Sequence, residues 1–268
     1  MNLLDNQIFL DRDIYMEEPL PLEKELKILF PGNKPLLILE AGACEGEDSI
    51  RYGRLFPSSQ IYAFEPMPGN IDIAKENFKK YNIQNVTLIE KALSDKNGSA
   101  QFFVSGGNPP GITGQDWDYG NKSSSLLYPA RHTEIAEFIR FDQTIIVGTI
   151  TLDEFCKENK IAGIDFIHMD VQGAEGMVLR GAVNSLPFTK AIWLEVSTID
   201  LYKDQALAEN IEGFMYNNGF IMIKDCLYGI SGERFYISKA FYPEHRRLFP
   251  VWTRRRSFLR KVLRKAGF

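Results

Sequence analysis

The chain has 268 residues, of which 44% are hydrophobic and 25% charged, and its formal net charge is −4. This length and composition predict one large globular α/β domain with embellishments rather than two domains. They exclude a membrane-spanning protein, because no segment approaches the roughly 18 uncharged apolar residues that a membrane helix needs.

The expected location follows from the N-terminus and the cysteines. Residues 1–16 carry three aspartates, whereas a signal peptide is basic and then apolar. Cys44, Cys156 and Cys226 are widely spaced and form no CxxC pair, which fits a reducing compartment and no structural zinc. We therefore expect a cytoplasmic protein.

Charge is unevenly distributed along the chain. Residues 244–268 contain nine Lys or Arg against one acid, so this segment carries +8 and the remainder −12. Nucleic-acid binding needs a basic face, so the acidic body predicts that the protein does not bind nucleic acid. In the tail, Phe258, Leu259, Val262 and Leu263 would form one stripe of a basic amphipathic helix. Such a helix can contact an anionic membrane surface, the acidic body or a partner protein.

In chain order, residues 1–35 form an extension in which Leu22 to Phe30 predicts an amphipathic helix that could lid a cofactor crevice. Leu36 to Leu39 is a continuous apolar run, as expected of a buried parallel strand. The turn Glu40-Ala41-Gly42-Ala43-Cys44-Glu45-Gly46 follows it. Its glycines would let the backbone turn tightly and approach a ligand.

A second strand, Gln60 to Glu65, ends in a carboxylate 23 residues after Gly42. This is close to the roughly 20 residues that place an acid where it accepts the hydrogen bonds of a ribose diol. The pattern predicts a nucleoside site that holds either a dinucleotide such as NAD or S-adenosylmethionine. A dinucleotide needs G-x-G-x-x-G beside a pyrophosphate, whereas Glu45, Glu47 and Asp48 would repel one. S-adenosylmethionine carries a sulfonium and an ammonium, so an acidic lip that includes Glu40 suits it better.

The remaining elements alternate until the end of the chain, which favours a doubly wound, mostly parallel sheet with a terminal antiparallel hairpin. That hairpin is typical of methyltransferase folds and not of NAD domains. The predicted helices cover residues 47–55, 70–81, 153–159, 175–180 and 204–217. The predicted strands cover residues 86–93, 99–105, 144–149, 164–171, 191–196, 220–225 and 234–238. Residues 106–128 are irregular, which is typical of a binding loop.

Two carboxylates stand near the carboxyl ends of central strands, where a crevice is expected. Asp170 and Glu195 could act as a base and its orienting partner, or together hold a divalent cation such as Mg²⁺. His168 lies two residues before Asp170 and so on the same strand face, where it could be catalytic or could only fill the structure. The sequence leaves these alternatives open.

Two segments resemble a known family. The turn at residues 40–46 is similar to the first motif of class I methyltransferases, and Phe64-Glu65-Pro66 to their ribose-binding acid. Asp165-Phe166-Ile167-His168-Met169-Asp170-Val171-Gln172-Gly173-Ala174-Glu175 resembles the signature of the FkbM-type methyltransferases. That family usually has Lys at the place of His168 and Glu at the place of Gln172. The resemblance covers about residues 36–240.

The resemblance implies a Rossmann-like class I methyltransferase domain at residues 36–243, with residues 106–128 as a substrate loop. It implies S-adenosylmethionine as cofactor and O-methylation of a sugar-containing or other small intermediate, free or linked to a glycan or lipid. The glycine turn, the spacing to Glu65 and the resemblance together assign cofactor contacts to Glu40, Gly42, Ala43, Gly46, Glu65, Pro66 and Asp170. The resemblance alone implies that Ala92 and Leu93 contact the adenine. The rival hypotheses are a non-catalytic binding or scaffolding module of the same fold and an NAD-dependent oxidoreductase.

Overall fold

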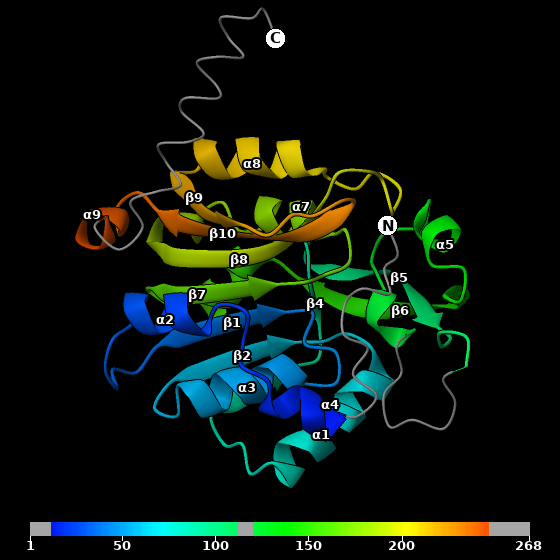
Figure 1. Cartoon of the computed structure of the whole chain (residues 1–268), viewed down its shortest axis with the longest axis horizontal. Helices are drawn as coiled ribbons and strands as arrows, with labels where there is room; N and C mark the ends of the chain where they lie inside the picture. Colours follow the sequence, from blue (N-terminus) through cyan, green and yellow to red (C-terminus); the bar gives the residue numbers. More distant parts are fainter. Residues whose placement is uncertain (1–11, 112–119, 247–268) are drawn as a thin grey trace, which may run out of the picture.

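A seven-stranded sheet forms the centre of the computed structural model, which describes residues 12–111 and 120–246 (Figure 1). The strand order is β3-β2-β1-β7-β8-β10-β9, and β10 alone runs antiparallel to its neighbours. The strands are β1 (Leu37–Ala41), β2 (Gln60–Phe64), β3 (Val86–Ile89), β7 (Ile164–Met169), β8 (Thr189–Ser197), β9 (Phe220–Asp225) and β10 (Ser231–Ser238). The predicted doubly wound sheet with a terminal hairpin is confirmed.

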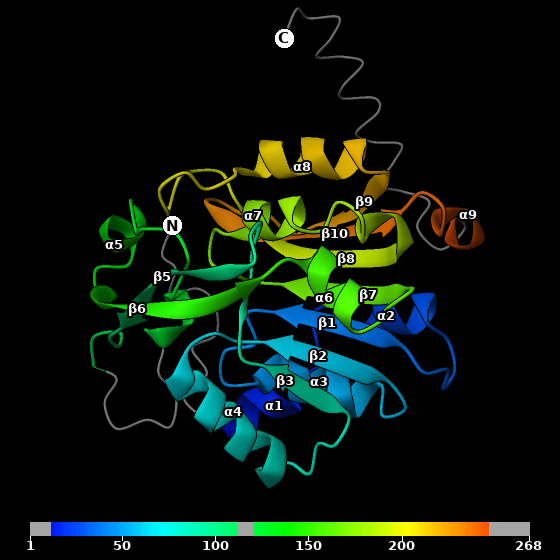
Figure 2. The same ribbon diagram turned by 180° about the vertical axis from the view of Figure 1, so that it is seen from behind.

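Helices cover both faces of this sheet, which explains why the central strands read as continuous apolar runs. On one face, Ile38 and Phe166 pack with Leu26 of α2 (Glu23–Leu29) and Tyr52 of α3 (Glu47–Leu55). On the other face, Leu39 and Ile167 pack with side chains of α6 (Leu152–Glu158), α7 (Glu175–Arg180) and α8 (Ala208–Asn217) (Figure 2). The remaining helices in the described ranges are α1 (Arg12–Glu17), α4 (Pro68–Lys80), α5 (His132–Ile135), α9 (Tyr242–His245) and the 3-10 turns η2 (Asn121–Ser123) and η3 (Leu186–Phe188).

A second, three-stranded sheet lies beside the carboxyl ends of β1, β2 and β7 (Figure 1). It consists of β4 (Ala92–Leu93), β6 (Arg140–Ile150) and β5 (Gly98–Gly106) in that order. The predicted strand over residues 86–93 is therefore two strands in two sheets. The break falls at Glu90 and Lys91, whose exposed charged side chains are unsuited to a sheet interior.

The N-terminal extension differs from the prediction in which helix approaches the glycine turn. The expected helix near residues 22–30 forms as α2, but Leu22, Leu26 and Leu29 bury its apolar side under the sheet. The preceding helix, α1, packs on α3 and reaches the turn instead. The lid hypothesis for residues 22–30 is therefore wrong, because its apolar stripe is used in the core.

Most of the basic tail, residues 247–268, lies outside the described residues, as do residues 112–119 of the expected substrate loop. Among the helices of the described ranges, none has the length and apolar content required to cross a bilayer.

Candidate active site

A crevice enclosing about 510 Å³ of empty space opens at the carboxyl ends of β1, β2 and β7. The strand order reverses between β1 and β7, and ligands of open α/β sheets bind at such a switch point. A second hollow of about 560 Å³ adjoins it, because both are lined by Gly42, Cys44, Lys122 and Asp170.

The glycine turn is shaped by close packing of the backbone. Gly42 has φ +85°, and a Cβ there would lie 1.8 Å from the carbonyl oxygen of Asp170. Gly46 also has φ +85°, and a Cβ there would lie 2.6 Å from the ring of Phe78. Gly42 lines both hollows and Gly46 neither. Gly42 thus brings the ends of β1 and β7 together, while Gly46 lets α3 and α4 pack, a role that sequence reasoning did not assign.

Glu65 is a buried hydrogen-bond acceptor at the end of β2. Its Oε2 accepts the Cys44 N–H (2.9 Å) and its Oε1 accepts the Met67 N–H (2.8 Å), which fixes the carboxyl group beside the glycine turn. Burial raises the pKa of Glu65 to about 7, although these hydrogen bonds oppose the shift. Pro66 lies next to it on the same wall.

Apolar side chains face Glu65 across the crevice. Ala92 and Leu93 line it as the sequence predicted, together with Phe102 and Leu126 of the second sheet and its connection. A fixed carboxyl group beside an apolar slot is the arrangement that a nucleoside requires, with acceptors for the ribose hydroxyls and a dry surface for the base. The residues present therefore fit the adenosyl part of S-adenosylmethionine.

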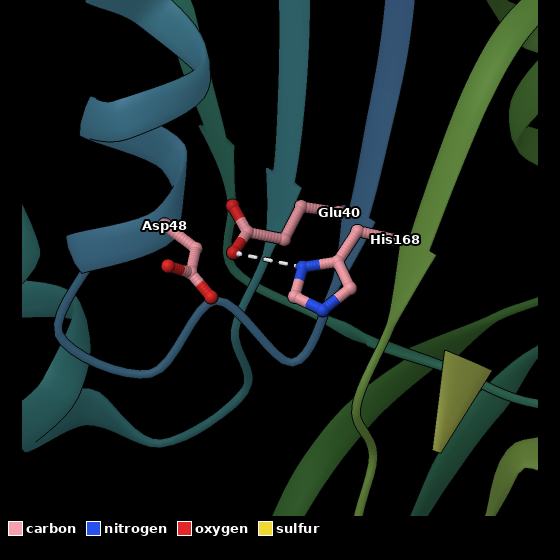
Figure 3. A group of neighbouring side chains, drawn as sticks. All are labelled: Glu40, Asp48 and His168. Carbon is pink, nitrogen blue, oxygen red and sulfur yellow. Dashed lines mark ion pairs between the residues drawn. The ribbon is translucent and has the colours of Figure 1, made fainter. Parts of the chain in front are cut away.

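Glu40, Asp48 and His168 point toward one another in the second hollow (Figure 3). Glu40 and His168 are register partners on β1 and β7, and Glu40 Oε1 lies 3.8 Å from His168 Nδ1. Burial alone would lower the pKa of His168, but Glu40 and the charge of Asp48 raise it to about 9. Both carboxyl groups favour the charged imidazolium, although burial raises the pKa of Glu40 too. Ala43 completes this wall.

The other acids of the turn are paired with cations that lie far away in the sequence but close in space. Glu45 forms an ion pair with Arg12 of α1, and it also accepts a hydrogen bond from Asn121 Nδ2 (2.8 Å). Glu47 lies 3.1 Å from Lys122 Nζ and 3.5 Å from Arg12 Nε. Asp48, which also lines the second hollow, forms an ion pair with Arg51 (2.7 Å). The acidic lip expected from the sequence is therefore largely compensated by nearby cations.

Asp170 and Glu195 are brought together, as predicted. Gln172 Nε2 donates to Asp170 Oδ1 (2.7 Å) and approaches Glu195 Oε2 (3.4 Å). Burial raises the pKa of Asp170. Burial, followed by the nearby charge of Asp170, raises that of Glu195 well above its ordinary value. Two close carboxyl groups cannot both ionise easily, so the negative charge of Asp170 adds to the effect of burial on Glu195.

Glu175 and Tyr202 hold in place the segment that follows Asp170. Glu175 Oε1 accepts the N–H groups of Val171 (3.1 Å) and Gly173 (3.3 Å), and burial raises its pKa to about 8. The hydroxyl of Tyr202 donates to the carbonyl of Ser123 (2.8 Å) and lies 3.0 Å from Gln172 Oε1. Gln172 itself has φ 52°, a left-handed conformation that a non-glycine residue adopts only where its surroundings require it.

Sequence reasoning missed Arg12, Asn121, Lys122 and Tyr202. Each reaches the site from outside the strand ends, and each contacts a partner 30 or more residues away in sequence. Only the polar and aromatic content of residues 106–128 signalled that this segment belongs to the site.

Comparison with known proteins gives a family. A sequence model described as the methyltransferase FkbM domain matches residues 40–222. The 2-O-methyltransferase NoeI of Sinorhizobium fredii is 36% identical over 169 residues, which are 63% of this chain and 66% of NoeI. Methyltransferase 1 of Beauveria bassiana is 25% identical over 146 residues, which are 54% of this chain and 57% of that protein. The alignments thus span less than two thirds of either relative.

Among solved structures, a precorrin-6y C5,15-methyltransferase from Geobacter metallireducens superposes with a TM-score of 0.41 at 15% identity. The superposition covers 82% of this chain and 90% of that one.

Proposed function

The chain belongs to the FkbM methyltransferase family, and on that premise we propose that it is an S-adenosylmethionine-dependent O-methyltransferase. Its acceptor is a hydroxyl group of a sugar-containing or other small biosynthetic intermediate, such as a polysaccharide, glycolipid or natural-product precursor. The observation that carries the proposal is that Asp170 and Glu65 line the same crevice, and that Gln172 contacts the carboxyl groups of both Asp170 and Glu195.

The cofactor assignment rests on the two adjoining hollows. Glu65 would hold the ribose, and Ala92 and Leu93 would hold the base. Glu40 and Asp48 would face the positively charged methionyl ammonium in the second hollow. When bound, S-adenosylmethionine supplies an electrophilic methyl group, so the protein has to align the acceptor and remove its proton.

We assign the removal of the acceptor's proton to Asp170. It is partly exposed to the crevice, and Gln172 holds its carboxyl group in one orientation. Glu195 keeps its proton, which leaves Asp170 as the acceptor for the hydroxyl proton while the new oxygen–carbon bond forms. His168 is assigned a positioning role, because its imidazole is paired with Glu40.

A divalent cation between the carboxyl groups fits this donor set poorly. Asp170, Glu175 and Glu195 each offer an oxygen within 4.8 Å of the others. However, Glu175 Oε1 already accepts two backbone N–H groups, and the amide of Gln172 points N–H donors at the other two. N–H donors oppose a cation at that place. Activity should therefore survive EDTA and should not rise with Mg²⁺.

The name of NoeI, a 2-O-methyltransferase, supports a hydroxyl acceptor for this chain. We propose a cytoplasmic location on the evidence of three cysteines that are all free. Contact of the basic tail with a membrane or a partner protein stays a prediction, since residues 247–268 are outside the described ranges.

The proposal is tested by incubating the full chain with methyl-labelled S-adenosylmethionine and a panel of sugars, nucleotide sugars, glycolipids and polyketides. Transfer of label to an acceptor oxygen, identified by mass spectrometry and NMR, is the expected result. Cofactor binding without transfer to any member of the panel would favour a non-catalytic module. Binding of NADH, followed by its fluorescence, would favour the oxidoreductase.

A further inference from the structure

Lys122 lies where the two hollows meet and lines both of them. The described residues that line these hollows include five acids, Glu40, Glu47, Asp48, Glu65 and Asp170. Within that described lining, the cationic side chains are Lys122 and His168. His168 is only 7% exposed and is paired with Glu40, so Lys122 is the cation better placed to meet a ligand.

The backbone on both sides of Lys122 is firmly held. Asn121 is buried and donates to Glu45 Oε1 (2.8 Å) and Asn70 Oδ1 (3.1 Å). Ser123 is buried too, and its carbonyl accepts the hydroxyl of Tyr202 (2.8 Å). These anchors fix the Cα position of Lys122 over the glycine turn, so its side chain is pre-organised for a ligand in the hollows.

The ammonium group stays charged at this place. Burial would lower the pKa of Lys122, but the nearby Cys44, Glu47 and Glu45 hold it above its ordinary value. Lys122 Nζ lies 3.1 Å from Glu47 Oε1 and 3.8 Å from Cys44 Sγ. The side chain of Lys122 is 28% exposed, whereas that of Glu47 is 6% exposed, so the ammonium can meet an anion in the hollows while it stays beside Glu47.

The cofactor has one negatively charged group, its α-carboxylate. Placing that group among Glu40, Asp48 and Asp170 without a cation would cost free energy, both from desolvation and from repulsion. We propose that Lys122 of η2 binds the α-carboxylate of the methionyl part of S-adenosylmethionine. This inference rests on the proposed function, because it requires S-adenosylmethionine in the crevice.

The test compares two ligands on two proteins by calorimetry. Decarboxylated S-adenosylmethionine keeps the sulfonium and the ammonium and lacks only the carboxylate. Lys122→Met should weaken the binding of S-adenosylmethionine roughly 30-fold, which is the effect of losing one charge-assisted hydrogen bond. Binding of the decarboxylated ligand should change less than about threefold, because that ligand has no carboxylate for the lysine to hold.

Matched variants separate contact from general damage. In Lys122→Met, Glu47 keeps Arg12 Nε at 3.5 Å, so no buried carboxylate loses its last cation. Lys122→Arg should retain most of the preference for the carboxylated ligand. Lys96→Met, an exposed site in the turn before β5, should leave both affinities unchanged.

Three results would overturn the inference. If Lys122→Met lost affinity equally for both ligands, Lys122 would be a structural residue. If it lost affinity for neither, Lys122 would not contact the carboxylate. If His168→Gln, but not Lys122→Met, lost the preference for the carboxylated ligand, His168 would be the residue that binds the carboxylate. If the wild-type protein binds neither ligand and not 5′-methylthioadenosine, the proposed function itself fails, which is a different outcome.

Discussion

Glu65 and Asp170 are both acids that follow parallel strands, yet their surroundings suit different tasks. Glu65 is 4% exposed and fixed by two backbone N–H groups, as a binding residue should be. Asp170 is partly exposed and lies near a second carboxyl group, Glu195, whose pKa is raised well above its ordinary value by burial and by the charge of Asp170. Such different environments are how one site separates binding from proton transfer.

Replacing Glu65 should affect the cofactor most. Glu65→Ala removes the acceptor proposed for two ribose hydroxyls, so the Kd for S-adenosylhomocysteine should rise about 100-fold. Calorimetry measures this. Glu90→Ala, which removes an exposed carboxylate paired with Lys75, is the control and should leave the Kd unchanged. An unaltered Kd in a folded Glu65→Ala protein would remove the ribose assignment.

Replacing Asp170 should affect turnover instead. Asp170→Asn keeps the shape of the side chain and a partner for Gln172 but cannot take a proton. We expect kcat to fall by about 10²- to 10⁴-fold, while the Kd for S-adenosylhomocysteine changes less than about threefold. Steady-state kinetics on the acceptor found by the labelling screen provides the measurement. Full activity would exclude Asp170 as the base.

Among the site residues, those near strand ends could be predicted from the sequence, and those on irregular segments could not. Glu65, Asp170 and Glu195 could be placed at one edge because a parallel sheet puts its carboxyl ends together. Lys122 contacts Glu47 from 75 positions away, and no spacing rule connects the two. The role of Gly46 in helix packing was missed for the same reason.

Among the elements, the turn between β1 and α3 tolerates the least change. Gly42→Ala would place a Cβ 1.8 Å from the carbonyl oxygen of Asp170, at φ +85°. Neither backbone segment can yield without breaking the hydrogen bond from the Asp170 N–H to the Ala41 carbonyl (3.0 Å). We expect a loss of more than about 3 kcal/mol in the free energy of unfolding, measured by denaturant titration.

Gly219→Ala is the matched control for that variant. Gly219 also has φ +85°, but a Cβ there would have no described atom within 4 Å beyond its chain neighbours, so only the backbone strain remains. Its cost should be about 1 kcal/mol. Equal losses at the two glycines would contradict the close approach of the β1 and β7 ends.

The apolar runs and capped helices of the core were predictable because their periodicity is local. The structure confirms the predicted helix at 47–55 within its bounds and extends the predicted strand at 144–149 to 140–150. The division of residues 86–93 between two sheets was not predictable, since Ala92 and Leu93 are as apolar as the strand before them. The charged side chain of Glu90 was the sequence feature that could have indicated this division.

For the whole molecule, buried titratable groups predict how stability depends on pH. Burial raises the pKa of Glu65 and Glu233 to about 7 and of Glu175 to about 8, from an ordinary 4.5. His168 is raised from 6.5 to about 9 by its carboxylate neighbours, against its burial. In every case the folded state binds more protons than the unfolded state between the two pKa values.

Stability of the ligand-free protein should therefore fall as pH rises. The His168 contribution is complete below pH 6.5 and is lost by about pH 9, and the three carboxyl groups act in the same direction between pH 4.5 and 8. One proton corresponds to about 1.4 kcal/mol per pH unit, or roughly 3 °C in Tm. Thermal unfolding from pH 6 to 9 measures the slope, which Glu233→Gln should reduce. A Tm that stays constant or rises would contradict these buried charges.

The doubly wound, mostly parallel sheet and its final antiparallel hairpin were predictable from the alternation of strands and helices, because connection rules leave few arrangements. How α1 and η2 close around the glycine turn was not, because that depends on pairs such as Arg12 with Glu45 that join distant segments. The fold thus followed from local pattern, and the enclosure of the site from long-range charge pairing.

A crystal structure of the full chain with S-adenosylhomocysteine would show where the cofactor binds. We expect the adenosyl group between Glu65 and Leu93, with both ribose hydroxyls donating to the Glu65 carboxyl group. The methionyl part should extend past Gly42 toward Glu40 and Lys122. An adenosyl group bound elsewhere, or a Glu65 carboxyl group that makes no contact with the ribose, would contradict the account.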